Sequence, residues 1–168
     1  MSSKIEAPAC VKEFMSHLYP DIDVDRISFH EGVPFYTFPG AAITIGPHIY
    51  FREEKFDPCG CKGIALIAHE LYHIHQGADG FGFWFLRPYY FRYAWAWLTS
   101  GFKSGEAHPL EAPAYDAADR IEKCCDRVRQ ATGQAGPCIC RDGRPTGVSE
   151  AFLSAFAAEC PDPLAGDD

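Results

Sequence analysis

Apolar residues recur at helical spacing in several stretches of the chain. The clearest such stretches are residues 8–19, 62–76, 109–131 and 149–159. Residues three or four positions apart lie on one face of a helix, so this spacing predicts helices with one buried side. Pro88 is suited to begin a further helix that runs to about residue 100. Gly77 stands where a left-handed cap would end the second helix.

Three short segments between the first two predicted helices are strand candidates. Residues 26–30 alternate apolar and polar positions, which is typical of a half-buried strand. Residues 41–45 and 49–52 flank a Gly-Pro-His turn that would join them as a hairpin. The order of helix, small sheet and further helices predicts an α+β fold with a small three-stranded sheet packed on the helices.

Length and composition narrow the class of protein. The chain has 168 residues, of which 47% are apolar, so we expect a single domain (1–168) with a real core and a mobile acidic tail (160–168). A net charge of −8 argues against nucleic-acid binding. No apolar run reaches the length of about 18 residues that a transmembrane helix needs. The first six residues lack the apolar core of a signal peptide, so the cytoplasm is the default expectation.

The motif with the clearest chemistry is His69-Glu70-Leu71-Tyr72-His73. Side chains four positions apart on a helix project from the same side, so His69 and His73 can bind one metal ion together. Glu70 cannot join them as a ligand, but it can take a proton from a water bound to that ion. Neutral imidazole and carboxylate ligands in an open site favour a single Zn²⁺ ion.

Two residues are candidates for the third ligand. Asp79 stands ten positions after His69, as in the long metzincin pattern, but the glycine of that pattern is displaced to Gly77. Glu111 continues the apolar stripe of the helix 109–131 at its N-terminal end, and a carboxylate at the margin of a core needs a cation nearby. We favour Glu111.

Three segments resemble those of small gluzincin-like metallopeptidases, also called minigluzincins. They are residues 64–76 with the histidine motif, residues 42–46 and 49–51 as the preceding strands, and residues 108–115 with Glu111. The resemblance covers roughly residues 24–120. It implies a small sheet packed on an active-site helix, a second helix that bears the glutamate ligand, one zinc ion and hydrolysis of peptide bonds.

The chain departs from this family at two positions after Glu111. Pro113 replaces the second glutamate of the family pattern, and Tyr115 stands where larger gluzincins often have an aspartate that supports a histidine. The nearest acidic residues are Asp116 and Asp119. An oxyanion donor is also required for hydrolysis, and Tyr115, Tyr72 and His108 are near enough in sequence to be candidates.

These observations lead to two alternative functions. The first is a zinc-dependent metallopeptidase that acts on a peptide or protein substrate, with Glu70 as general base and His69, His73 and Glu111 as metal ligands. The second is a non-catalytic zinc-binding or interaction module with the same fold. The presence of Glu70 favours the enzyme, because binding a metal does not require it. Substrate and oligomeric state stay open.

Two further features of the sequence need a structural explanation. Residues 81–98 include ten aromatic residues, for which core packing, an apolar substrate wall and membrane-surface contact are the interpretations, in that order. Trp95 and Trp97 cannot share one helix face, so we expect at least one to be partly exposed.

Eight cysteines are more typical of oxidising compartments, so disulfides that join the loop at Cys59 or the loop 138–140 to a helix are expected, with buried thiols as the alternative.

Overall fold

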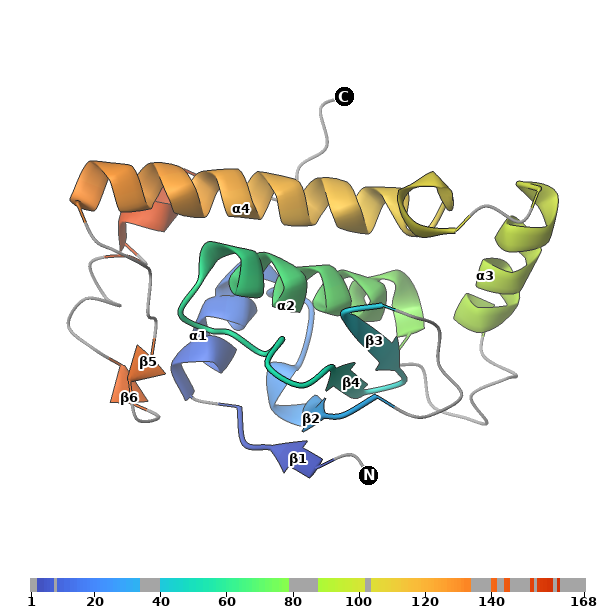
Figure 1. The fold of residues 1–168 in the computed structure, drawn as a ribbon, viewed down its shortest axis with the longest axis horizontal. Coiled ribbons are helices and arrows are strands. Elements are labelled where there is room, and N and C mark those ends of the chain that lie inside the picture. Colours follow the sequence, from blue (N-terminus) through green and yellow to red (C-terminus); the bar gives the residue numbers. More distant parts are fainter. Residues whose placement is uncertain are drawn as a thin grey trace.

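The computed structural model describes residues 3–7, 9–33, 40–78, 88–101, 104–133, 140–141, 144–145, 152, 154–158 and 160. Within them the fold is α+β, as the sequence predicts: a small sheet lies on one side of helix α2 (Cys61–His73), and helix α4 (Ala112–Thr132) crosses the other side (Figure 1). Helix α1 (Ala9–Leu18) completes the core, and helix α3 (Pro88–Thr99) lies at one end of the molecule.

The sheet has four strands in the order β1-β2-β4-β3. Strands β3 (Ala42–Ile45) and β4 (His48–Phe51) form the predicted antiparallel hairpin, and β2 (Ser28–Glu31) pairs in parallel with β4. The prediction of three strands is wrong by one, because β1 (Ser3–Ile5) adds an antiparallel strand beside β2. Three residues are too few to show a strand periodicity in the sequence.

The strands alternate in burial, as expected when one face of a sheet covers a core. Phe29, Ile49 and Phe51 are almost fully buried, and the rings of Phe29 and Phe51 stack across the parallel pair. His30 and Tyr50 are half-buried and stack with a centroid distance of 4.7 Å. Because successive residues point to opposite faces, the apolar face of the sheet is the one that meets α2.

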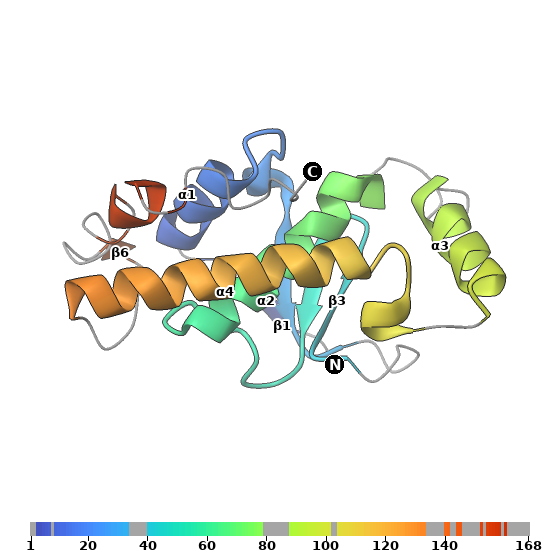
Figure 2. The same ribbon diagram turned by 90° about the horizontal axis from the view of Figure 1, so that it is seen from above.

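Helices α2 and α4 run antiparallel beside each other. Buried residues on α2 include Ile64, Ile67 and Leu71, and on α4 they include Ile121 and Val128. The disulfide Cys61–Cys125 joins the start of α2 to the second half of α4, over a Cα separation of 5.6 Å. Figure 2 shows the two helices crossing closely in the second view as well. This arrangement brings the C-terminal end of α2 beside the segment that precedes α4.

A second disulfide joins the neighbouring residue of α4 to the C-terminal segment. Cys124 pairs with Cys160, and Cys59 is disulfide-bonded as well. The expectation of disulfides is confirmed, and the two described pairs link helix to helix and helix to C-terminal segment. The loop residue Cys59 is bonded as well, while Cys138 lies outside the described residues. The bonds hold α4 against α2 and against the helical residues 154–158.

The remaining elements are short. The 3-10 helices Val24–Arg26 and Gly105–Ala107 precede β2 and α4, and strands β5 (Cys140–Arg141) and β6 (Arg144–Pro145) form a two-stranded ribbon within the segment predicted as a loop. The predicted mobile tail lies outside the described residues, except for Cys160. None of the helices in the described part of the chain has the length and apolarity to span a membrane.

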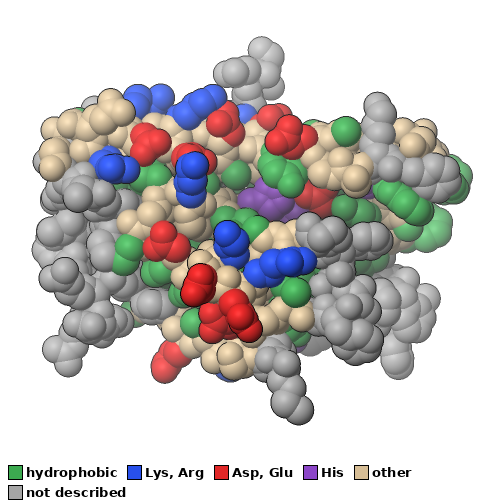
Figure 3. All heavy atoms as spheres, in the orientation of Figure 1, with side chains coloured by type: hydrophobic (Ala, Val, Ile, Leu, Met, Phe, Trp, Pro, Cys, Tyr) green, Lys and Arg blue, Asp and Glu red, His purple; other side chains and the backbone are tan. Residues whose placement is uncertain are grey.

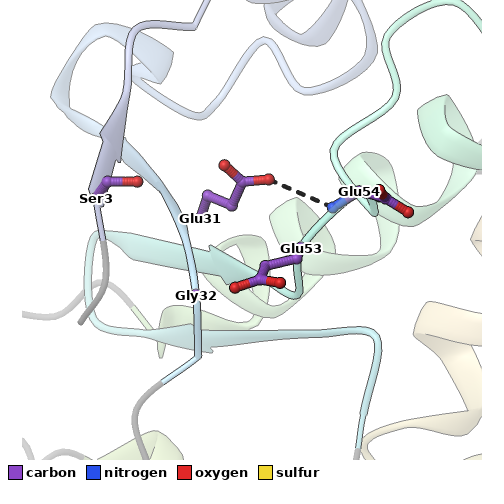
Figure 4. Close-up of a pocket in the computed structure, with 5 residues that line it drawn as sticks. All are labelled: Ser3, Glu31, Gly32, Glu53 and Glu54. Atoms are coloured by element: carbon purple, nitrogen blue, oxygen red, sulfur yellow. Dashed lines mark hydrogen bonds between the residues drawn. The ribbon is translucent and has the colours of Figure 1, made fainter.

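An acidic hollow lies at the edge of the sheet next to β1 (Figure 4). It has a volume of about 320 Å³ and is lined by Ser3, Glu31, Gly32, Glu53 and Glu54. The Glu31 carboxylate accepts a hydrogen bond from the Glu54 amide, and Glu54 adopts a left-handed φ of 62°. The three glutamates that line the hollow are at least partly exposed, and none of the lining residues belongs to the histidine motif.

Candidate metal centre

Three potential ligand atoms converge where α2 ends and α4 begins. The Nε2 atoms of His69 and His73 lie 3.3 Å and 3.4 Å from Oε2 of Glu111. The two imidazole rings are nearly perpendicular, and both histidines are buried. Among the described residues, these three form the one group of histidines, cysteines and acids with ligand atoms close enough to hold a metal ion together.

The spacing of these atoms fits a first-row metal ion. Ligand atoms bound tetrahedrally at about 2.0–2.1 Å from a zinc ion are themselves roughly 3.3 Å apart. The two nitrogen-to-oxygen distances are close to that value, and all three ligand atoms lie within 4.8 Å of one another. Two imidazoles and one carboxylate also leave a fourth position open, which is typical of catalytic rather than structural zinc sites.

Glu111 reaches the histidines from the point where a turn leads into α4. Glu111 occupies the N-cap position of α4, and its amide donates to the carbonyl of His108. Its own carbonyl accepts the amide of Tyr115, so it is already part of the first helical turn. The side chain is 15% exposed and continues the buried stripe of α4 towards α2.

Side chains outside the ligand set hold the ligands in place. Gln76 Oε1 lies 3.1 Å from His73 Nδ1, while its Nε2 donates to the carbonyl of Leu110, 2.9 Å away. Gln76 thus joins the segment after one ligand to the residue before another. When Nε2 of His73 binds a metal ion, Nδ1 keeps the proton and can donate it to Oε1 of Gln76.

Two tyrosines of α3 add to this support. The Tyr89 hydroxyl lies 3.1 Å from His73 Nδ1, and the Tyr93 hydroxyl donates to Glu111 Oε1 over 2.9 Å. Tyr93 therefore occupies the carboxylate oxygen that does not face the histidines. Neither tyrosine is among the site residues that the sequence predicts, although their spacing of four within the predicted helix places them on one face.

The C-terminal end of α2 has an unusual geometry that places Gln76. Residues Ile74–Ala78 form a π-helical turn, and Gly77 adopts a φ of 98°. This left-handed conformation is the cap that the sequence predicts at Gly77. A π turn inside or at the end of a helix is frequent at functional sites. Its effect here is to bring the Gln76 side chain beside His73 and Leu110.

Glu70 lies beside the ligands and is held by the sheet. Its carboxylate Oε2 lies 2.7 Å from the hydroxyl of Thr44 on β3, which also lies 3.0 Å from the Glu70 carbonyl. Glu70 is buried, and burial raises its pKa above the usual range for a carboxyl group, against the influence of His73 and His69. Thr44 is buried as well, so strand β3 fixes the carboxylate next to the histidine pair.

The charge distribution around Glu111 suits a cation. Burial opposes ionisation of Glu111, but hydrogen bonds from His69, His73 and Tyr93 outweigh it and hold its pKa far below the usual range. Burial also opposes a charge on His73, yet contact with Glu111 raises its pKa overall. The carboxylate is thus stabilised by neighbouring positive charge, which a bound metal ion would also supply.

The other residues singled out in the sequence occupy different positions. The Tyr115 ring packs edge-on against His69, with 4.6 Å between centroids, and its side chain is partly exposed. His108 is fully buried, stacks on Tyr93 and accepts the amide of Leu110, so it organises the turn before α4. Asp116 is exposed.

Tyr72 lies against His75, which has its Nδ1 2.6 Å from Asp21 and faces away from the cluster. Asp79, the alternative ligand, lies outside the described residues.

The described residues thus place a His-Glu-x-x-His helix on a small sheet, with a carboxylate from the N-cap of a later helix beside its two histidines, as a possible metal site. Residues 7–81 match the family model described as the eCIS core domain. The match spans less than half of the chain. It contains both histidines and Glu70 but ends before Glu111, so the third potential ligand and its support from α3 lie beyond it.

No curated protein and no solved structure matches the chain significantly.

Proposed function

We propose that this chain is a zinc-dependent metallopeptidase of the gluzincin type. His69, His73 and Glu111 would hold the ion, and Glu70 would act as general base. The observation that carries the proposal is Glu70: a buried carboxylate beside the three ligands, excluded from the ligand set and held in place by Thr44. A site that only binds metal has no need of such a carboxylate, whereas hydrolysis requires a base at that place.

The chemistry divides between the ion and the chain. When bound, zinc would polarise the scissile carbonyl and lower the pKa of a water molecule. Glu70 takes a proton from the water as its oxygen attacks the carbonyl carbon. Glu70 then gives the proton to the amide nitrogen as the C–N bond breaks, which leaves a carboxylic acid and an amine. The raised pKa of Glu70, caused chiefly by burial, suits a group that must both accept and return a proton.

Tyr115 is the best candidate for the oxyanion donor. Its ring contacts His69 and its partial exposure places it at the mouth of the site. Burial together with the nearby Glu111 raises the pKa of Tyr115, so its hydroxyl keeps its proton at neutral pH. His108 is less suitable, because it is fully buried and its Nδ1 already accepts the Leu110 amide.

Strand β3 suggests how an extended peptide would be bound. It is an edge strand of the sheet among the described residues, and its Thr44 contacts Glu70. An extended chain can add to such an edge through main-chain hydrogen bonds, with its side chains alternating between the two faces. A peptide in that position would pass beside the proposed general base. Histidine side chains are visible below the start of α4 in the space-filling view (Figure 3).

The decisive experiment compares the wild-type chain with Glu70→Gln. Both are loaded with zinc, assayed for metal content and incubated with a diverse peptide library that is read by mass spectrometry. We expect cleavage by the wild type, a loss of roughly 10²–10⁴-fold in the variant, and equal zinc content in both. Glu13→Gln, an exposed glutamate on α1, is the matched control. Equal zinc content without cleavage by either protein would favour the non-catalytic module, and absence of zinc would refute the metal site itself.

A further inference from the structure

Helix α3 has two faces of different character. One face carries Tyr89 and Tyr93, which contact the metal-ligand cluster, followed by the half-buried Ala96. The opposite face carries Phe91, Trp95 and Leu98, which are 70%, 60% and 53% exposed. These three residues, at spacings of four and three, form one continuous stripe that we call the apolar stripe. Within the described residues 88–98, the predicted core packing holds for the tyrosine face, while residues 81–87 lie outside the described part of the chain. The expected exposure of a tryptophan is confirmed.

A stripe of large apolar side chains in water is unfavourable, and on soluble proteins such patches commonly mark interaction surfaces. The position of α3 is also informative. The helix lies at one end of the long axis of the molecule in both ribbon views, so its outer face can meet a flat surface without obstruction by α1, α2 or α4 (Figures 1 and 2). Hydrophobic side chains gather at that end in the space-filling view (Figure 3).

The charge of this segment differs from that of the rest of the chain. Residues 80–105 contain three of the 15 basic residues and none of the 23 acidic ones. Arg92, which is exposed, stands directly beside Phe91 on α3. An anionic surface would therefore repel the rest of the chain and attract this segment, which would orient the molecule with α3 towards the surface.

We propose that α3 docks on an anionic phospholipid bilayer, with the apolar stripe in the interfacial region and Arg92 among the headgroups. Tryptophan and phenylalanine are favoured at that depth, and a helix that combines an apolar face with cations binds in the plane of the interface. A second copy of the chain is a less suitable occupant, because two cationic helices would then face each other. The proposal does not depend on peptidase activity. It would place the metal centre close to the membrane, since the inner face of α3 contacts Glu111 and His73.

The test uses the full chain and vesicles of phosphatidylcholine, either pure or with about 30% phosphatidylserine. We expect co-sedimentation with the anionic vesicles and much weaker binding to the neutral ones. Phe91→Ser combined with Trp95→Ser should lower vesicle affinity by roughly tenfold or more. Arg92→Gln should lower it by about fivefold, on the anionic vesicles only. Lys123→Gln, an exposed cation on α4, is the matched control and should bind as the wild type does.

Two further measurements keep the result unambiguous. Circular dichroism and zinc content should be unchanged in the serine variant, which shows that α3 still supports the ligands. In a chain with Trp84→Phe and Trp97→Phe, brominated lipids should quench the fluorescence of Trp95. Failure of the wild type to bind anionic vesicles, or wild-type binding by the serine variant, would overturn the proposal. A dimer in light scattering that the serine variant dissolves, without vesicle binding, would assign the stripe to a second copy and overturn it equally.

Discussion

The two ends of the α2–α4 pair are closed by different chemistry. At one end, Cys61 at the start of α2 is bonded covalently to Cys125 on α4. At the other end, the Nε2 atoms of His69 and His73 lie 3.3 Å and 3.4 Å from Oε2 of Glu111. Because the helices are antiparallel, the disulfide joins the start of α2 to the second half of α4, and the potential metal ligands lie where α2 ends and α4 begins. The disulfide end only joins the two helices, whereas the other end also places a buried carboxylate, that of Glu70, beside the three potential metal ligands.

The largest expected effect comes from breaking the metal end alone. Structural zinc sites with four ligands contribute about 10–16 kcal/mol of binding free energy, so the loss of one of three ligands should cost on the order of 4 kcal/mol. That value corresponds to a zinc affinity about a thousandfold lower for His73→Ala or Glu111→Ala. Titration with a competing zinc indicator measures it. Retention of wild-type affinity by Glu111→Ala would assign the third ligand elsewhere, with Asp79 the next candidate.

Removing the Cys61–Cys125 disulfide should affect the stability of the fold more than its zinc affinity. Replacing Cys61 and Cys125 together by serine opens a loop of 64 residues and should lower the free energy of unfolding by about 2–4 kcal/mol. Urea denaturation of the zinc-loaded proteins measures the loss. At low urea concentration, zinc affinity should fall by much less than in His73→Ala. An equal fall in both would mean that the disulfide, rather than local packing, positions the ligands.

An intermediate effect is expected from Gln76, which supports the metal end without binding the ion. Gln76→Leu removes both of its hydrogen bonds and should lower zinc affinity by roughly 10–100-fold. Gln76→Glu keeps an acceptor for His73 Nδ1 but loses the donor to Leu110, so it should retain more affinity than the leucine variant. The spectrum of the Co²⁺-substituted protein reports the ligand geometry in each case. Unchanged affinity and spectrum in Gln76→Leu would exclude a positioning role.

The smallest effect should come from the surface of α4 between the two ends. Lys123 and Asp119 form an exposed ion pair one helical turn apart. Such pairs contribute about 0.3–0.5 kcal/mol, so Lys123→Ala should change the free energy of unfolding within that range and leave zinc affinity unaltered. A larger loss in urea denaturation would show that the disulfide and the ligand cluster hold α4 less firmly than the structure indicates.

The two ends also differ in how far the sequence predicts them. The helical spacing of His69 and His73 and the apolar stripe leading to Glu111 are local patterns, and the structure brings those three side chains together. The supporting tyrosines are harder to predict, because an aromatic segment offers no polar contrast to show which face turns inward. The pairing of Cys61 with Cys125 depends on tertiary packing, and eight cysteines allow 105 pairings.

The fold shows the same division between local and distant interactions. Helices α1, α2, α3 and α4 begin and end within a few residues of the predicted positions, and the β3–β4 hairpin follows from its turn. The parallel pairing of β2 with β4 and the addition of β1 involve residues far apart in sequence, so no short-range pattern encodes them. The π turn at Ile74–Ala78 is likewise a consequence of packing at the end of α2.

The adjacency of Cys124 and Cys125 makes the oxidative folding of this chain consequential for its chemistry. Neighbouring residues on a helix differ by about 100° around the axis. An isomer in which Cys61 captured Cys124 would rotate α4 by that angle and carry the carboxylate before its first turn away from the imidazoles. A scrambled preparation would then resemble a compact protein that fails to retain zinc, and a disulfide isomerase would restore metal uptake without any change in sequence.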